Sequence, residues 1–144
     1  MELVFEVQGL DFRAAGDGAS KLKGVLHQVG FPPDLVRRVT VAAFEAEMNI
    51  VIHAHRGQLR ISISPEKIVV VAEDEGPGIP NIELAMQEGY STAPPRIREM
   101  GFGAGMGLPN IKRCADVLEI RSEVGRGTYL RAEFYCRPPG GRGV

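Results

Sequence analysis

Long hydrophobic runs are missing from this sequence of 144 residues. No stretch reaches the roughly 18 consecutive apolar residues that mark a membrane-spanning helix, so the sequence predicts none. A surplus of charge is missing too: the net charge is −1, which excludes the broad positive field that attracts nucleic acid or anionic membranes. The N-terminal residues, MELVFEVQGL, have neither the positive start nor the apolar stretch of a signal peptide. We therefore expect a cytoplasmic protein that binds neither nucleic acid nor a membrane.

Cysteine is scarce as well, because the chain has only Cys114 and Cys136, far apart and in no metal-ligand spacing. We expect two reduced thiols, as in a cytoplasmic protein, in preference to a structural disulfide. The length suits one domain with one hydrophobic core. We assign residues 1–136 to this domain and expect the tail, residues 137–144 (RPPGGRGV), to be disordered.

The spacing of apolar residues predicts the elements of this domain. The predicted strands cover residues 2–8, 58–64, 67–74, 118–124 and 128–135, the last four as two hairpins. The predicted helices cover residues 20–29, 35–55, 82–88 and 107–116, with Ser20 capping the first and Asp34 the second. Strands with one polar face need helices on the other face only. The pattern therefore predicts a two-layer α+β sandwich, in which three helices cover one side of a mixed, mostly antiparallel sheet.

Polar residues interrupt the apolar stretch FEAEMNIVIHA in the longest predicted helix. Glu45 and Asn49 are four residues apart and share a helical face, and His53 continues the stripe. One interpretation is a solvated helix face. The other is chemical: Asn49 gives an oxygen ligand to Mg²⁺ beside nucleotide phosphates, and Glu45 accepts a proton from an attacking hydroxyl or water.

An acid, Asp74, ends the buried strand KIVVVAED and is followed by a turn containing Gly76, Gly78 and Ile79. Its carboxylate can accept a hydrogen bond from an exocyclic amine such as that of adenine. The two glycines would let the backbone approach a flat ring. A plain strand-ending turn is the alternative interpretation.

Alternating glycines lead directly into the helix predicted over residues 107–116. Free backbone amides at a helix N-terminus form an anion site that would suit a triphosphate, although a flexible hinge is the other interpretation. The loop is neither a Walker A loop nor a dinucleotide fingerprint, because no G-K-[ST] follows it and no βαβ unit surrounds it. The candidate phosphate-binding residues are Gly103, Gly105, Met106, Gly107 and Leu108.

A hairpin turn at residues 125–127 precedes Thr128, whose hydroxyl could also bond to the adenine side of a ligand. The four motifs, E-x-x-x-N, D-x-G-x-G, G-x-G-x-G and G-x-G-T, occur in the order in which the GHKL ATPase superfamily has them. From about residue 35 to residue 134 the chain resembles this superfamily, which includes histidine kinases, gyrase-type ATPases, Hsp90 and anti-sigma kinases.

The resemblance implies the Bergerat fold, with ATP and Mg²⁺ as ligands. It implies that Asn49 binds the metal and that Glu45 is the general base. It also implies that Asp74 recognises adenine and that Thr128 supports the adenine pocket. The glycines that hold the phosphates would be Gly103, Gly105 and Gly107.

Residues 82–128 further resemble the bacterial anti-sigma factor kinases and the related stressosome switch kinases. This implies a protein serine/threonine kinase that phosphorylates a STAS-domain partner in a stress or sporulation pathway, engages a sigma factor or a phosphatase, and can form a homodimer. We expect no histidine kinase, because His27 lacks the context of a phosphoacceptor. We also expect no gyrase-, MutL- or Hsp90-type ATPase, because no transducer domain is recognised. The alternative is a nucleotide-gated binding module that sequesters a regulator, against which the presence of Glu45 argues.

One departure concerns the arginine that anti-sigma kinases carry just before the phosphate loop, where this chain has Gly103 or Ala104. A cation elsewhere could replace it, or all the candidates could be solvated surface charges. We expect residues 89–103 to form a lid over the triphosphate, with Phe102 and Met106 serving lid closure or partner contact. The candidate cations are Arg96, Arg98, Lys112 and Arg113.

Overall fold

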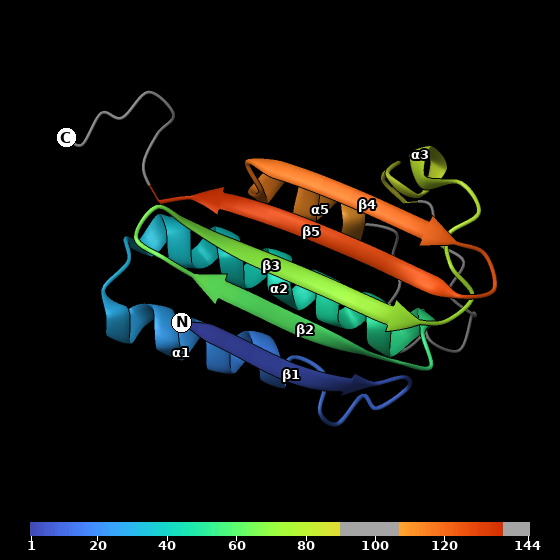
Figure 1. The fold of residues 1–144 in the computed structure, drawn as a ribbon, viewed down its shortest axis with the longest axis horizontal. Helices are drawn as coiled ribbons and strands as arrows, with labels where there is room; N and C mark the ends of the chain where they lie inside the picture. Colours follow the sequence, from blue (N-terminus) through green and yellow to red (C-terminus); the bar gives the residue numbers. More distant parts are fainter. Residues whose placement is uncertain (90–106, 137–144) are drawn as a thin grey trace.

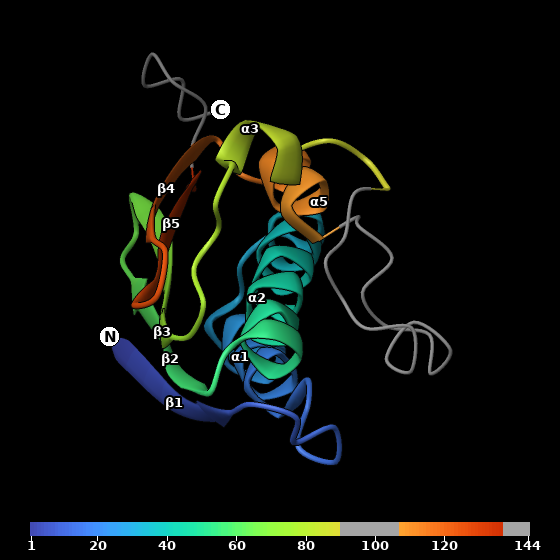
Figure 2. The same ribbon diagram turned by 90° about the vertical axis from the view of Figure 1, so that its right-hand side faces the viewer.

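An antiparallel sheet forms one layer of the protein and the helices form the other (Figures 1 and 2). The structure is a computed structural model that describes residues 1–89 and 107–136. The strands are β1 (Glu2–Gln8), β2 (Arg56–Ile63), β3 (Lys67–Glu75), β4 (Val117–Glu123) and β5 (Gly127–Tyr135). The helices are α1 (Asp17–Val29), α2 (Pro33–His53), α3 (Ile82–Ala85) and α5 (Gly107–Cys114). The predicted two-layer α+β sandwich, with helices on one face, is confirmed.

The five strands lie in the order β1-β2-β3-β5-β4, and every neighbouring pair is antiparallel. The two predicted hairpins, β2–β3 and β4–β5, are present. The parallel component of the predicted mixed sheet is absent from the described strands, for a topological reason. β4 runs in the same direction as β3, but β5 lies between them, so the two never pair.

The hydrophobic core lies between α2 and the inner face of the sheet. Alternate residues of the central strands point inward, and helix residues at helical spacing meet them. Each large aliphatic side chain buried in this way stabilises the fold by about 1.5–3 kcal/mol. Fully buried residues of the two layers include Leu59, Ile61, Ile68, Val70, Phe134, Val39, Ala43 and Ile111.

The start of α1 differs from the prediction, because the helix begins at Asp17 and Ser20 does not cap it. Gly16 is the N-cap, with φ of 91°, a conformation that favours glycine. The free amides of the first turn are bonded by Glu47, which lies on α2 and is only 3% exposed. A tertiary contact therefore replaces the local cap that the sequence suggested.

The start of α2 also differs, because Pro33 is its first residue and Pro32 its N-cap, so Asp34 lies inside the first turn. Proline suits this position because a first-turn N–H has no partner in the helix. The other predicted helix ends shift by a few residues: α2 ends at His53, α3 at Ala85 and α5 at Cys114.

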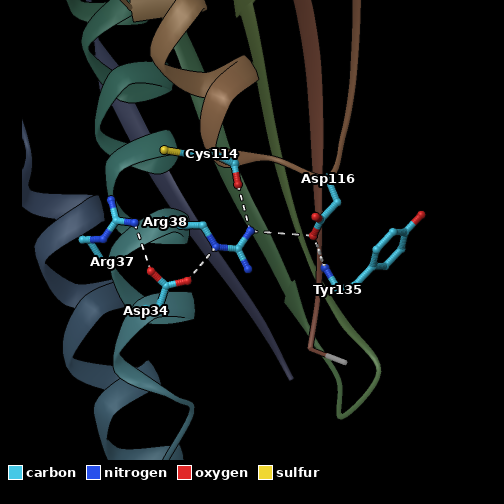
Figure 3. A network of polar contacts seen from close by, with 6 residues as sticks. All are labelled: Asp34, Arg37, Arg38, Cys114, Asp116 and Tyr135. Carbon is cyan, nitrogen blue, oxygen red and sulfur yellow. Dashed lines mark hydrogen bonds and ion pairs between the residues drawn. The ribbon is translucent and has the colours of Figure 1, made fainter. Parts of the chain in front are cut away.

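Arg38 joins three elements at the end of the sheet where β3 begins, as Figure 3 shows. Its guanidinium donates to the carbonyl oxygen of Cys114 at 3.0 Å, to Asp34 at 3.3 Å, and lies 3.7 Å from Asp116. Asp116 in turn accepts the N–H of Tyr135 at 2.7 Å. A cation at the last carbonyl groups of a helix is favourable, so Arg38 fixes the end of α5 against α2 and β5.

In the part of the chain that the structure describes, no helix has both the length and the apolar character needed to cross a bilayer. Cys114 and Cys136 are both free cysteines in the structure.

Candidate functional site

The polar stripe of α2 lies against the first residue of α5. Glu45 and Asn49 are half-buried and one helical turn apart. A Cβ atom built on Gly107 would lie 3.3 Å from Asn49 Oδ1 and 3.8 Å from Glu45 Oε2. Glycine at position 107 therefore lets the N-terminus of α5 approach both side chains, while the buried Leu108 anchors the helix in the core.

This juxtaposition places an amide oxygen and a carboxylate beside the end of a helix that attracts anions. Backbone N–H groups in a first helical turn lack partners and carry partial positive charge. Among the described residues, no cluster of three or more His, Cys, Asp or Glu side chains could hold a metal by itself. A divalent cation at Asn49 would therefore need further oxygens, and phosphates at the start of α5 are the fitting source.

Asp74 lies near the C-terminal end of β3 and is half-buried. Its Oδ1 accepts a hydrogen bond from the backbone N–H of Thr128 at 3.1 Å. Two glycines pack tightly around it. A Cβ on Gly127 would lie 2.0 Å from the carbonyl oxygen of Asp74, and a Cβ on Gly57 would lie 2.9 Å from its Cβ. The backbone around Asp74 is therefore closely packed from two neighbouring strands, which holds the carboxylate in one place.

The turn after β3 is fastened to the β4–β5 hairpin. The N–H of Gly76 donates to the carbonyl oxygen of Arg126 at 2.9 Å, and a Cβ on Gly76 would lie 2.9 Å from the Cα of Ala54. Gly78 has φ of 76°, and a Cβ there would lie 2.4 Å from the carbonyl oxygen of Glu123. Both predicted glycines are thus required by close backbone approach.

A hydroxyl pair completes this corner. The N–H of Ile79 donates to Ser122 Oγ at 2.7 Å, and Ser122 Oγ lies 2.9 Å from Thr128 Oγ1. The structure therefore brings five predicted residues together at one corner of the sheet. They are Asp74, Gly76, Gly78, Ile79 and Thr128.

The candidate site has two parts: Glu45 and Asn49 beside α5, and the group around Asp74 at the corner of the sheet. They meet at the end of α2. Ala54, which follows the helix, packs against Gly76, and the preceding turns of α2 carry Asn49 and Glu45. His53 is the last residue of the helix and keeps an exposed surface. Partial desolvation lowers the pKa of His53 below its ordinary value, so its imidazole is neutral near pH 7.

Several predicted residues lie outside the residues that the structure describes. They are Gly103, Gly105 and Met106 of the glycine loop, Phe102, and the candidate cations Arg96 and Arg98. Of the lid proposed for residues 89–103, only Gly89 is described. Lys112 and Arg113 are described, and both are exposed. Arg113 pairs with Glu88, whereas Lys112 lines a groove between α3, α5 and β4.

Sequence reasoning missed two side chains that contact predicted site residues and a third, on α2, that holds the start of another helix. Asn110 donates to Glu45 Oε2 at 3.0 Å, Ser122 links Ile79 to Thr128, and Glu47 holds the start of α1. A signal existed for two of them. Asn110 lies three residues after Gly107 on one helix face, and Ser122 is the cross-strand partner of Thr128 in the predicted hairpin.

A shallow groove of about 390 Å³ lies between α3, α5 and β4, away from the residues described above. Most of its lining residues are apolar, and one residue of each charge is among them. Of the predicted residues, only the candidate cation Lys112 lines it. The lining residues are Ile82, Met86, Lys112, Ala115, Asp116, Leu118 and Ile120.

A carboxylate–amide pair beside a helix N-terminus, together with a half-buried acid at the end of a central strand, defines a nucleotide-binding domain of the α+β class. The histidine kinase-like ATPase domain family matches residues 14–134. The chain belongs to this family, as its motifs predicted, and membership implies that it binds ATP.

Two relatives and one solved structure are similar to this chain. Serine/threonine-protein kinase RsbT of Bacillus subtilis (strain 168) is 34% identical over 119 residues, which cover 80% of this chain and 84% of RsbT. The anti-sigma F factor of Thermoanaerobacter sp. (strain X514) is 36% identical over 102 residues, which cover 67% of this chain and 68% of that protein. A chain in the crystal structure of the SiaB–SiaC complex from Pseudomonas aeruginosa has a TM-score of 0.63 at 19% identity, covering 92% of this chain and 88% of that one, so the two share the fold.

Replacing Asp74 by Asn is expected to weaken ATP and ADP binding by roughly 10- to 100-fold, the usual range for a hydrogen bond to a charged group. When the Asn oxygen accepts the Thr128 N–H, its NH₂ group takes the place of the second carboxylate oxygen and faces the ligand amine donor against donor. Burial raises the pKa of Asp74 above its ordinary value, so the wild type should lose affinity as the pH falls through that raised pKa. Isothermal titration across pH measures both effects.

The matched control for this change is Asp34→Asn. Asp34 is an exposed acid near the N-terminal end of α2. It should leave nucleotide affinity unchanged at every pH. Equal affinities for Asp74→Asn and the wild type would remove Asp74 from the nucleotide site.

Proposed function

We propose that this protein is an ATP-dependent protein serine/threonine kinase of the anti-sigma and switch-kinase type. Its substrate is a serine or threonine hydroxyl of a STAS-domain partner in a stress or sporulation pathway, and it acts in the cytoplasm. One observation carries the proposal: the Glu45 carboxylate lies beside Asn49 and against the N-terminus of α5, where Gly107 makes room for them. The similarity to RsbT, which is named a serine/threonine-protein kinase, supports it.

In this proposal the two halves of the site have separate tasks. Asp74 accepts a hydrogen bond from the exocyclic amine of adenine. The N–H of Thr128 bonds to Asp74, and Ser122 bonds to Thr128, so both support the adenine pocket. The glycine loop, which includes Gly103, Gly105 and Met106, would bind the triphosphate together with the start of α5 at Gly107 and Leu108. Asn49 would hold Mg²⁺, which would neutralise phosphate charge during transfer.

The chemical step requires a base for the partner's hydroxyl proton. The hydroxyl oxygen bonds to the γ-phosphorus while the bond from that phosphorus to the bridging oxygen breaks, and ADP leaves with the electron pair. Glu45 accepts the proton, directly or through one water. Phosphoryl transfer depends mainly on positioning and on neutralised charge, so a fixed carboxylate near the helix end suffices as the protein's own chemical group.

The test is phosphate transfer from γ-labelled ATP with Mg²⁺, using STAS-domain proteins encoded near this one as substrates. Label on a serine or threonine of one partner supports the proposal and identifies the substrate. Tight ATP binding with no transfer to any STAS-domain partner contradicts it.

A second candidate function is favoured by the similarity to anti-sigma F factors. In this alternative the protein sequesters a regulator, such as a sigma factor or a phosphatase, in a manner that depends on bound nucleotide. Co-purification with a sigma factor that responds to ATP or ADP, without phosphate transfer, would favour it. Glu45 then has no chemical task, so Glu45→Gln should leave this binding unchanged.

A further inference from the structure

A side chain that no motif includes contacts the proposed base. Asn110 lies in the middle of α5, and its Nδ2 donates to Glu45 Oε2 at 3.0 Å across the interface between α5 and α2. Both residues are half-buried. In the described part of the chain, the other carboxylate oxygen of Glu45, Oε1, accepts no hydrogen bond. One oxygen is thus held by Asn110, and among the described residues the other has no donor.

The direction of the Asn110 amide follows from its second neighbour. Arg113, one turn later on α5, donates from Nη2 to Asn110 Oδ1. Arginine has only donors, so the amide oxygen must face Arg113 and the NH₂ group must face Glu45. Arg113 also forms an ion pair with Glu88. The contacts from Glu88 through Arg113 to Asn110 therefore fix which amide atom meets the base.

The residue type points to the same role. Asparagine has a low helix propensity, yet Asn110 occupies the middle of an eight-residue helix. Packing alone would be served as well by an apolar residue of the same volume. The contact that its NH₂ group makes with Glu45 is a task that an apolar residue could not perform.

We propose that Asn110 is a positioning residue for Glu45. Its amide holds Oε2 so that Oε1 faces the hydroxyl or water that gives up a proton. This inference rests on the proposed chemical role of Glu45 and assigns Asn110 no contact with nucleotide. Small displacements of a catalytic group cost rate much more than they cost binding, so the effect should be on kcat.

The variants are Asn110→Leu, which keeps the volume without polar atoms, and Asn110→Asp, which sets a second carboxylate against Glu45. We expect each to lower kcat roughly 10- to 100-fold, in line with the cost of misplacing a catalytic group, with nucleotide Kd within about twofold of wild type. Asn81→Asp is the matched control, because Asn81 caps α3 through Leu84 and aspartate caps equally well. It should leave kcat unchanged.

A double-mutant cycle separates positioning from structural damage. If Asn110 acts through Glu45, Asn110→Leu should cost less than about threefold in a Glu45→Gln background, since non-additivity marks residues that act as a unit. The same loss in both backgrounds, or wild-type kcat for Asn110→Leu, overturns the inference.

The cycle is measured on phosphate transfer and, separately, on Mg²⁺-dependent ATP hydrolysis. Absence of transfer with measurable hydrolysis rejects the kinase proposal, while the hydrolysis cycle still decides the role of Asn110. If the wild type neither transfers nor hydrolyses, Glu45 moves no proton and the positioning role is rejected with it.

Discussion

Replacing Glu45 by Gln is expected to reduce phosphate transfer to the partner by roughly 10²- to 10⁴-fold, the usual contribution of a positioned general base. Glutamine keeps the shape of the side chain, and its oxygen can still accept the Asn110 N–H. It cannot accept a proton from a hydroxyl. Nucleotide affinity should therefore change by less than about threefold, because the lost interaction belongs to the transition state alone. Single-turnover transfer with γ-labelled ATP and nucleotide titration measure the two quantities.

The matched control is Glu66→Gln, an exposed residue in the β2–β3 turn at the other end of β3 from Asp74. It should transfer phosphate at the wild-type rate. Transfer that survives in Glu45→Gln would assign the base to another group, and a large loss of nucleotide affinity would make Glu45 a binding residue instead.

Replacing Glu47 by Ala is expected to lower the free energy of unfolding by about 2–4 kcal/mol, because the N–H donors at the start of α1, two of them buried, would lose a charged acceptor. The Glu47 carboxylate accepts the N–H groups of Gly16 and Ala19 at 3.0 Å and that of Gly18 at 3.3 Å. These groups belong to the cap and first turn of α1, where a negative charge also complements the helix dipole. Urea unfolding should show a lower midpoint with an unchanged slope.

Two further variants make this result specific. Glu47→Gln keeps the volume but turns an NH₂ group toward one side of the amide cluster, so it should also destabilise, by less than alanine does. Asp17→Ala removes an exposed acid from the same first turn and should cost less than about 1 kcal/mol. Equal midpoints for Glu47→Ala and Asp17→Ala would mean that the buried carboxylate contributes no more than a surface charge.

Residues near each other in sequence account for what could be predicted of the fold. Alternation along residues 2–8 located β1 with its bounds, and the hairpin turns located both strand pairs. The helix starts were harder to predict, because the start of α1 is fixed by a residue far away in the sequence. Glu47, about thirty residues further along the chain, supplies the acceptors for α1 that Ser20 was expected to supply. The strand order could not be predicted from local patterns either, because such patterns do not say whether β4 or β5 pairs with β3.

The sequence by itself determined the family and the two-layer class of fold, and it supplied the residue types of the candidate site. The helical period already places Glu45 beside Asn49, and the strand-ending turn already joins Asp74 to Gly76. Tertiary structure alone decided that Gly107 lies against Asn49, that Asn110 contacts Glu45, and that Ser122 bridges Ile79 and Thr128. The physical reason is that periodicity fixes neighbours within one element. Contacts between elements depend on which strands pair and on how closely small residues let backbones approach.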